Sequence, residues 1–142
     1  RANLTDANLA GADLTRADLY GANLTGVNLA GANLDSADLA GANLTGAFLH
    51  HANLTGAYLT DAYLTRAYLT GAYLPDADLT RAYLTRAYLA GANLHRANLA
   101  GANLDGADLT DVKNLDTVYG LTDIKNPPPE VIAAIAAQRI LG

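Results

Sequence analysis

The sequence predicts an all-β solenoid, a rod in which the chain winds round in stacked coils, followed by a short C-terminal α-helix. Three observations predict the rod. Leucine stands at Leu4 and at every fifth position after it through Leu109, which makes 22 repeats. Alanine stands two residues before each of these leucines, with Val27 as the only exception. A period of five matches neither a helix nor a flat strand, so the chain must turn within every repeat.

The fixed positions predict which side chains point inward. Residues two apart in an extended segment lie on the same side of the chain, so the alanine and the leucine face the core and the residue between them faces out. The two variable residues after each leucine are typical of a turn. Glycine at the second of these places suits a type II turn, whereas Arg66 and Asp61 there predict a different turn type. The expected structural core includes Leu24, Leu44, Leu64 and Leu84.

The repeat A-[N/D]-L-x-x, as in "ANLTDANLAGADLTRADLYGANLTG", resembles the pentapeptide repeat family. The resemblance covers residues 2–111, and it implies a bacterial, cyanobacterial-type protein because long, regular repeats of this kind are abundant in cyanobacteria. In that family, four repeats make one coil of a right-handed quadrilateral parallel β-helix. The resemblance therefore implies about five and a half coils, stacked over about 26 Å at ~4.8 Å per coil.

We expect the chain to have two parts. Residues 1–111 form the pentapeptide-repeat β-helix, and residues 112–142 form an irregular segment plus a capping helix over about residues 129–141. The five-residue register breaks because Leu115 falls one residue late. Irregularly spaced apolar residues then follow.

The C-terminal helix is predicted from its ends. Pro129 suits the first helical position, Glu130 is favourable at the N-terminus, and Arg139 is favourable near the C-terminus. We expect the helix to fold onto the last coil and hide its open end. The alternative is a dimerisation helix. The first coil begins directly in register, so a homodimer through a rod end is a further possibility.

The sequence contains no pattern that points to catalysis, to a cofactor or to a metal. The chain has no cysteine and a single serine, Ser36. His50 and His51 are adjacent, but His95 lies at another corner about two coils away, too far to complete a metal site. An interior of leucine and alanine leaves no cleft in which a substrate could bind. We therefore expect a non-enzymatic protein.

Aromatic residues replace Asn or Asp at the outward position in the middle of the rod, which departs from the usual pattern of the family. Residues 20 apart stack in successive coils if each coil has four repeats. Tyr83 should then lie above Tyr63, and Phe48, Tyr68 and Tyr88 should form a column of three rings. The outward aromatic residues are Phe48, Tyr58, Tyr63, Tyr68, Tyr73, Tyr83 and Tyr88.

Arg66 and Arg86 should stack at the corner next to these columns. Tyrosine and arginine are enriched among the residues that dominate binding energy at protein interfaces. We therefore interpret the seven aromatic residues and these two arginines as an interaction belt. The alternative is a self-stabilising aromatic ladder that has no partner.

Charge and hydropathy limit the classes of partner. A net charge of -5 argues against direct nucleic-acid binding, which needs a basic face. No apolar stretch is long enough for a membrane span. We expect a soluble protein, in the cytoplasm, or in the periplasm or thylakoid lumen if a signal peptide has been removed.

The sequence thus predicts a non-enzymatic scaffold or interaction module whose partner is another protein. The alternative comes from the resemblance, since some members of the family protect DNA gyrase by presenting an acidic, duplex-like rod. In this chain the tyrosines and five arginines interrupt the acidic surface. These arginines are Arg16, Arg66, Arg81, Arg86 and Arg96.

Overall fold

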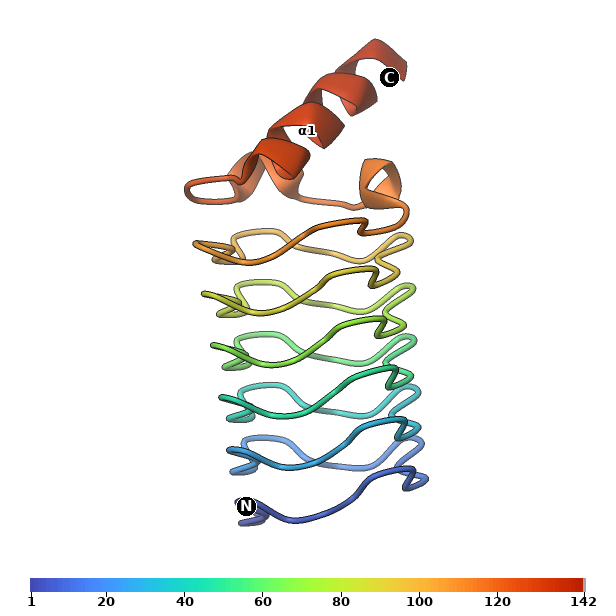
Figure 1. Ribbon diagram of the computed structural model, residues 1–142, viewed down its shortest axis with the longest axis vertical. Helices are drawn as coiled ribbons and strands as arrows, with labels where there is room; N and C mark the ends of the chain where they lie inside the picture. The colour runs from blue at the N-terminus through green and yellow to red at the C-terminus, as the bar shows by residue number, and fades with distance from the viewer. Residues whose placement is uncertain (142) are drawn as a thin grey trace.

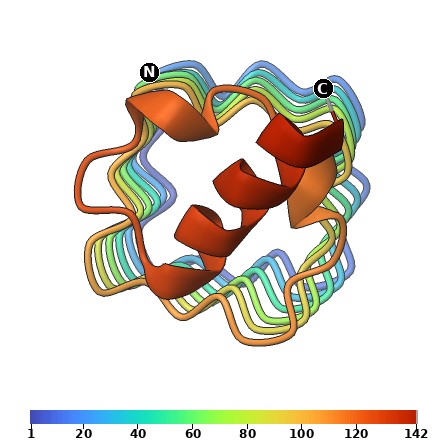
Figure 2. The same ribbon diagram turned by 90° about the horizontal axis from the view of Figure 1, so that it is seen from above.

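The computed structural model describes residues 1–141 as a rod of stacked coils with a helix at one end (Figure 1). Seen along the rod axis, the coils superimpose in a four-sided outline (Figure 2). Parallel β-bridges join each outward residue to the residue 20 positions later, from the pair Asn3–Asn23 to the pair Asn93–Lys113. One coil of the rod therefore takes four five-residue repeats, as the resemblance implied.

Backbone hydrogen bonds connect every coil to the next. The Tyr63 N–H donates to the Ala42 carbonyl at 2.9 Å, and the Tyr63 carbonyl accepts from the Leu44 N–H at 2.7 Å. The same pair of bonds recurs at the outward residues along the rod. Each side of a coil is only one bridge long, so this regular stacking replaces the long strands of an ordinary sheet.

Alanine and leucine side chains fill the interior of the rod. Leu24 and Leu44 are 0% exposed, and Leu64 and Leu84 are 1% exposed. No polar or charged side chain is buried within residues 1–141. The core is therefore a solid apolar column, and its burial is the main favourable contribution to folding.

All the corners between sides use one backbone geometry. At the corner of Arg66, the Ala67 N–H donates to the Leu64 carbonyl at 3.0 Å, and the equivalent bond forms at the glycine corners. The second corner residue has a positive φ in both kinds of corner, 57° at Arg66, 58° at Asp61 and 64° at Gly46. The prediction of a different turn type at Arg66 and Asp61 was therefore wrong. The bonds between coils hold these corners in the left-handed region, at a cost of about 1–2 kcal/mol for each non-glycine residue.

The outward Asn and Asp side chains brace the corners that follow them. Asn3 Oδ1 accepts from the Thr5 backbone N–H at 3.2 Å and from the Thr5 hydroxyl at 2.7 Å. The bond to the backbone recurs in every repeat that has Asn or Asp between alanine and leucine. A short side chain with an acceptor oxygen therefore satisfies a corner N–H that has no partner in the neighbouring coil.

Two of these bracing carboxyls have a lowered pKa. The Thr15 hydroxyl donates to Asp13 Oδ1 at 2.6 Å, and the Thr110 hydroxyl donates to Asp108 Oδ1 at 2.6 Å. These hydroxyl bonds, helped by the backbone N–H of the same threonine, lower the pKa of each carboxyl. The ionised carboxylate is therefore the form that braces these two corners best.

The stacking of coils continues past residue 111, but with longer sides. Asn98 pairs with Tyr119, 21 positions later, and Asn103 pairs with Lys125, 22 positions later. Each added residue lies in a short 3₁₀ helix that replaces a corner, first η1 (Leu115–Thr117) and then η2 (Leu121–Asp123). Two sides of the last coil, from Lys113 to Tyr119 and from Tyr119 to Lys125, therefore have six residues instead of five.

A period of six is also visible in the sequence after the break. The inward residues Val112, Val118 and Ile124 are six apart, so the expectation of irregular apolar spacing was wrong. Left-handed residues follow the same period, with φ values of 61° at Asn114, 75° at Gly120 and 48° at Asn126. Asparagine and glycine are the residues that adopt this conformation most easily, which explains their regular spacing.

The helix α1 (Pro129–Leu141) lies diagonally across the end of the rod (Figure 2). Val131 and Ala134 are buried, and Gln138 Nε2 donates to the Val118 carbonyl at 2.8 Å. The helix contacts both η1 and η2. Its exposed large apolar side chains are Ile132, Ile140 and Leu141. None of the helices in residues 1–141 has the length and apolar character that a membrane crossing requires.

We predict that Gly120→Ala destabilises the rod more than Gly91→Ala. Both glycines have a positive φ, 75° and 67°, so both substitutions incur the left-handed cost. A Cβ at Gly120 would lie 2.5 Å from the backbone of Ala100, whereas a Cβ at Gly91 would meet nothing within 4 Å. Denaturant unfolding should therefore show a loss larger by about 1–3 kcal/mol for Gly120→Ala. Equal losses would show that the last coil relaxes freely at this contact.

We also predict that the double variant Asp13→Asn, Asp108→Asn resists acid better than the parent protein. Both folded-state pKa values are lowered, so the ionised carboxyls add stability above the unfolded pKa of about 3.9. That contribution is lost as the pH falls through the lower, folded-state pKa. Asparagine keeps the acceptor oxygen but does not titrate. Thermal unfolding measured between about pH 5 and pH 2 should fall less steeply in the variant, and parallel curves would contradict the prediction.

Candidate functional site

The structure brings five of the outward aromatic residues together in two columns on neighbouring sides of the rod. The rings of Tyr63 and Tyr83 stack with centroids 4.9 Å apart and planes 4° apart. The rings of Phe48 and Tyr68 stack at 5.0 Å and 4°, and those of Tyr68 and Tyr88 at 4.9 Å and 5°. The spacing of the coils imposes this arrangement, because outward residues of successive coils are joined by the same bridges.

Tyr58 and Tyr73 lie on the other two sides of the rod. The bridge partners of Tyr58 are Asp38 and Asp78, so no aromatic residue lies above or below it. The partners of Tyr73 are both asparagines, and within residues 1–141 neither ring stacks on another aromatic ring. These two tyrosines are therefore separate from the two columns.

Arg66 and Arg86 lie at the corner between the two columns. Arg66 comes after Tyr63 and before Tyr68 in the chain, and Arg86 has the same place one coil later. Neither forms an ion pair within residues 1–141. We call this surface the aromatic–arginine patch, and it consists of Phe48, Tyr63, Arg66, Tyr68, Tyr83, Arg86 and Tyr88.

His50 extends the second column sideways, which the sequence analysis missed. Its ring lies 5.5 Å from the Tyr68 ring and 6.2 Å from the Phe48 ring, with planes 22° apart in both cases. From the sequence, His50 was considered only as a possible metal ligand. The available signal was its place two residues after Phe48, where a corner residue would otherwise bond to an outward Asn or Asp.

The aromatic residues also leave corner N–H groups without the acceptor that Asn or Asp provides elsewhere. Within residues 1–141, no oxygen accepts from the backbone N–H of Thr65 or Thr85, which follow Tyr63 and Tyr83. The same holds for Thr70 and Ala90 beside the second column. Each of these four residues is only half-buried. The patch is therefore rich in hydrogen-bond donors.

Most carboxylates lie on the other sides of the rod, although Asp108 follows Tyr88 in the second column, and two carboxylates are paired with arginines. Arg81 donates to Asp61 through Nε at 2.8 Å and through a terminal nitrogen at 2.6 Å. This bond lowers the pKa of Asp61 and raises the pKa of Arg81. Arg96 pairs with Asp76 at 3.4 Å. In each pair the arginine lies one coil after the aspartate, at the same corner.

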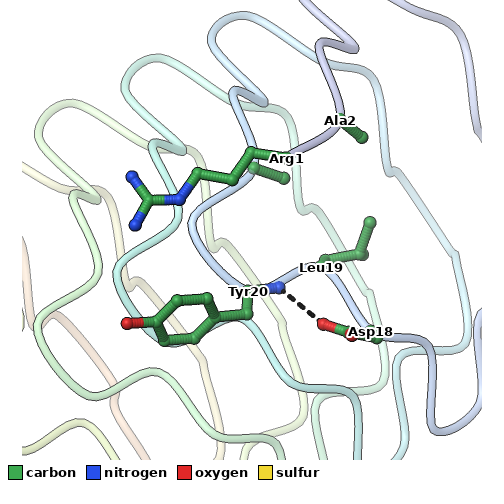
Figure 3. Close-up of a pocket in the computed structure, with 6 residues that line it drawn as sticks. Arg1, Ala2, Asp18, Leu19 and Tyr20 are labelled. Carbon is green, nitrogen blue, oxygen red and sulfur yellow. Dashed lines mark hydrogen bonds between the residues drawn. The ribbon is translucent and has the colours of Figure 1, made fainter.

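A hollow at the first coil is lined by Arg1, Ala2, Asp18, Leu19, Tyr20 and Ala22 (Figure 3). The Arg1 guanidinium lies 5.8 Å from the centre of the Tyr20 ring, a cation–π distance. Asp18 Oδ1 accepts from the Tyr20 N–H at 3.1 Å. The hollow holds one carboxylate, that of Asp18, and one phenol, that of Tyr20. Residues 1–141 contain no cluster of His, Asp and Glu that could hold a metal ion.

Comparison with solved structures finds pentapeptide repeat proteins of cyanobacteria. HetL of Nostoc sp. strain PCC 7120, involved in heterocyst differentiation regulation, is 36% identical, with a TM-score of 0.70. The match covers 83% of this chain and 63% of HetL, so this chain spans less than two thirds of its length. Rfr23 of Cyanothece 51142 is 28% identical over 83% of this chain and 87% of its own, with a TM-score of 0.53.

A trypsin-treated variant of QnrB1, a plasmid-mediated fluoroquinolone resistance protein, is 21% identical. The match covers 82% of this chain and 67% of that chain, and its TM-score of 0.38 gives no support to a shared role. Among proteins with curated descriptions, none matches this chain.

The family model described as pentapeptide repeats matches in eight copies, which fall in residues 2–41, 22–61, 32–71, 62–95 and 77–113. These matches cover well over half of the chain. Together with the pairing of residues 20 apart, they show that this protein belongs to the pentapeptide repeat family.

Proposed function

We propose that this protein is a non-enzymatic scaffold that binds another protein through the aromatic–arginine patch. The observation that carries the proposal is the meeting of five aromatic rings and two unpaired arginines at one corner of the rod. In this proposal, residues 1–111 form a right-handed rod of about five and a half coils. Residues 112–142 close its end, and the rod serves as a rigid support for the patch.

The stacking of the rings supports an interface rather than opposing it. Phe48 is 40% exposed, Tyr63 47%, and Tyr83 and Tyr88 each 43%, so much of the surface of these four residues remains open to a partner. The rings are already held parallel, and they would lose little side-chain freedom on binding. Such preorganisation lowers the entropic cost of association. The columns therefore stabilise the rod and prepare a binding surface at the same time.

A non-enzymatic role follows from the closed interior and the convex surface. Catalysis by acid and base needs groups that converge on a substrate in a cleft. The carboxylates of this rod instead brace corners or pair with arginines, as Asp13 and Asp61 do. No cofactor is required for the proposed role.

A DNA-mimicking protein that binds or protects gyrase is the second candidate. The observation in its favour is the column of Asp18, Asp38 and Asp78 on one side of the rod. Tyr58 interrupts this column, and Arg81 lies at the corner that follows it. We rank this candidate second because a duplex mimic needs an unbroken line of negative charge. Protection of gyrase supercoiling by the added protein would reverse the ranking.

A homodimer through a rod end is a separate possibility for assembly. Ile132, Ile140 and Leu141 of α1 are 56%, 84% and 81% exposed, and these side chains are the surface that a second copy would cover. Such a dimer would leave the patch free, because the patch lies on the middle coils. Light scattering of the purified protein measures this assembly independently of any partner.

We predict that the variant Tyr63→Asn, Tyr68→Asn, Tyr83→Asn, Tyr88→Asn folds normally but loses its protein partner. Each asparagine can accept from the corner N–H two residues later, a bond that contributes about 0.5–1.5 kcal/mol. That gain offsets the lost ring stacking, which contributes about 0.5–1.5 kcal/mol per pair. Unfolding experiments should show a small net change, and affinity purification from the source organism should no longer recover the proteins that bind the parent.

The matched control for this experiment is Tyr58→Asn. This substitution also removes an exposed outward tyrosine and supplies an acceptor for the next corner, but it lies outside the patch. The control should keep the partner. If the fourfold variant keeps the partner as well, and is only less stable, the columns are a structural ladder and the proposed function is wrong.

A further inference from the structure

We propose that the aromatic–arginine patch recognises an acidic segment of its partner protein, a stretch of Asp or Glu side chains. This inference rests on the proposed function, which places the interface, and it adds the chemistry of the partner. Four features of the patch point to carboxylates: the environment of the arginines, the orientation of the rings, the free backbone donors and the distribution of charge on the rod.

The rod itself shows what an arginine at a corner binds. At another corner, the Arg81 guanidinium binds both oxygens of Asp61, which has the same place one coil earlier. One coil before Arg86, the same corner position holds Arg66, and one coil before Arg66 it holds Gly46. A Cβ on Gly46 would meet no atom within 4 Å, so the space beside Arg66 is open. A carboxylate from a partner can occupy the space that Asp61 fills at the other corner.

Tyr68 presents its edge to a partner, because stacked rings cover both of its faces. Phe48 and Tyr88 lie against the two faces of Tyr68 at 5.0 and 4.9 Å. The edge of an aromatic ring is electropositive and its face electronegative. Binding of a cation on the face of Tyr68 is therefore blocked, whereas an anion beside the ring edges is favoured.

The backbone at the same corner adds donors that need an acceptor. The N–H groups of Thr65 and Thr85 have no acceptor within residues 1–141 and lie next to Arg66 and Arg86 in the chain. Guanidinium groups are also donors only. A carboxylate accepts hydrogen bonds and donates none, so it complements this corner better than an amide or a hydroxyl does.

The small number of cations in the patch favours a short protein segment over nucleic acid. Two arginines displace too few counterions for strong binding to a phosphate backbone. A second copy of this chain also carries carboxylates, such as those of Asp111 and Asp123, that form no ion pair within residues 1–141. Self-association through the patch is therefore a competing outcome that the test must separate.

The test uses the full chain and a fluorescein-labelled peptide of alternating Glu and Gly. Fluorescence anisotropy at low ionic strength should show binding of this peptide, weakening as salt is added. A peptide with Gln in place of Glu should not bind. The variant Arg66→Ser, Arg86→Ser should weaken binding of the Glu peptide at least about ten-fold. Serine fits such a corner, since Ser36 has a φ of 56° there.

The matched control is Arg16→Ser, Arg96→Ser. It removes the same charge from corners with nearly the same backbone, φ 56° and 55°, but it leaves the patch intact. The control should change the affinity for the Glu peptide by less than about two-fold. An equal loss in both double variants would mean that the peptide senses only net charge, and the inference would be wrong.

The remaining outcomes separate this inference from the proposed function. In one outcome, the fourfold tyrosine variant loses the protein partner while Arg66→Ser, Arg86→Ser keeps it. That result would support the proposed interface and contradict the inference that the partner segment is acidic. If both variants keep the partner, both proposals fail. Patch-dependent binding of a single-stranded oligonucleotide more tightly than the Glu peptide would overturn the inference. Self-association of the protein that the variant Arg66→Ser, Arg86→Ser abolishes would also overturn the inference.

Discussion

The hydrogen bonds between successive coils are the constraint on which the rest of this structure depends. As far as the pair Asn93–Lys113, they relate each outward residue to the one 20 positions later. They also hold the second residue of each corner at a positive φ, even where that residue is arginine. The same bonds set the spacing of outward side chains, so that rings in successive coils lie 4.9 Å apart. Outward side chains at equivalent positions of successive coils are therefore held at a fixed spacing along the rod.

The outward position has two uses that exclude one another. With Asn or Asp, the side chain bends back and bonds to the next corner, as Asn3 does. With tyrosine, the ring extends outward and stacks, and the corner loses that brace. One repeat avoids the unpaired donor in a different way, because Pro75, which has no N–H, follows Tyr73 at this place. The patch is thus a region where corner bracing has been replaced by exposed surface.

Much of the fold could be predicted because one short pattern, repeated without a gap, determines which side chains are inside. The stacking of Tyr63 on Tyr83 could also be predicted, because residues 20 apart lie in successive coils when each coil has four five-residue repeats. The turn at Arg66 could not be predicted, because local preference disfavours a positive φ there and only the bonds between coils impose it. The contact of the His50 ring with Tyr68 joins successive coils, so a local reading of the chain does not reveal it. The free donors at Thr65 and Thr85 follow from the tyrosine two residues earlier, and they become apparent only once the bracing role of Asn and Asp is known.

The six-residue sides at the end of the rod have a consequence for growth of the solenoid. A coil in which Asn103 pairs with a residue 22 positions later has a longer perimeter than the coils before it. Where η1 replaces a corner, the Arg96 N–H donates to the Thr117 hydroxyl at 2.9 Å instead of to a backbone carbonyl of the next coil. The regular ladder of backbone hydrogen bonds between corners therefore stops at this coil, which makes the end a poorer template for stacking, in addition to the cover that α1 provides.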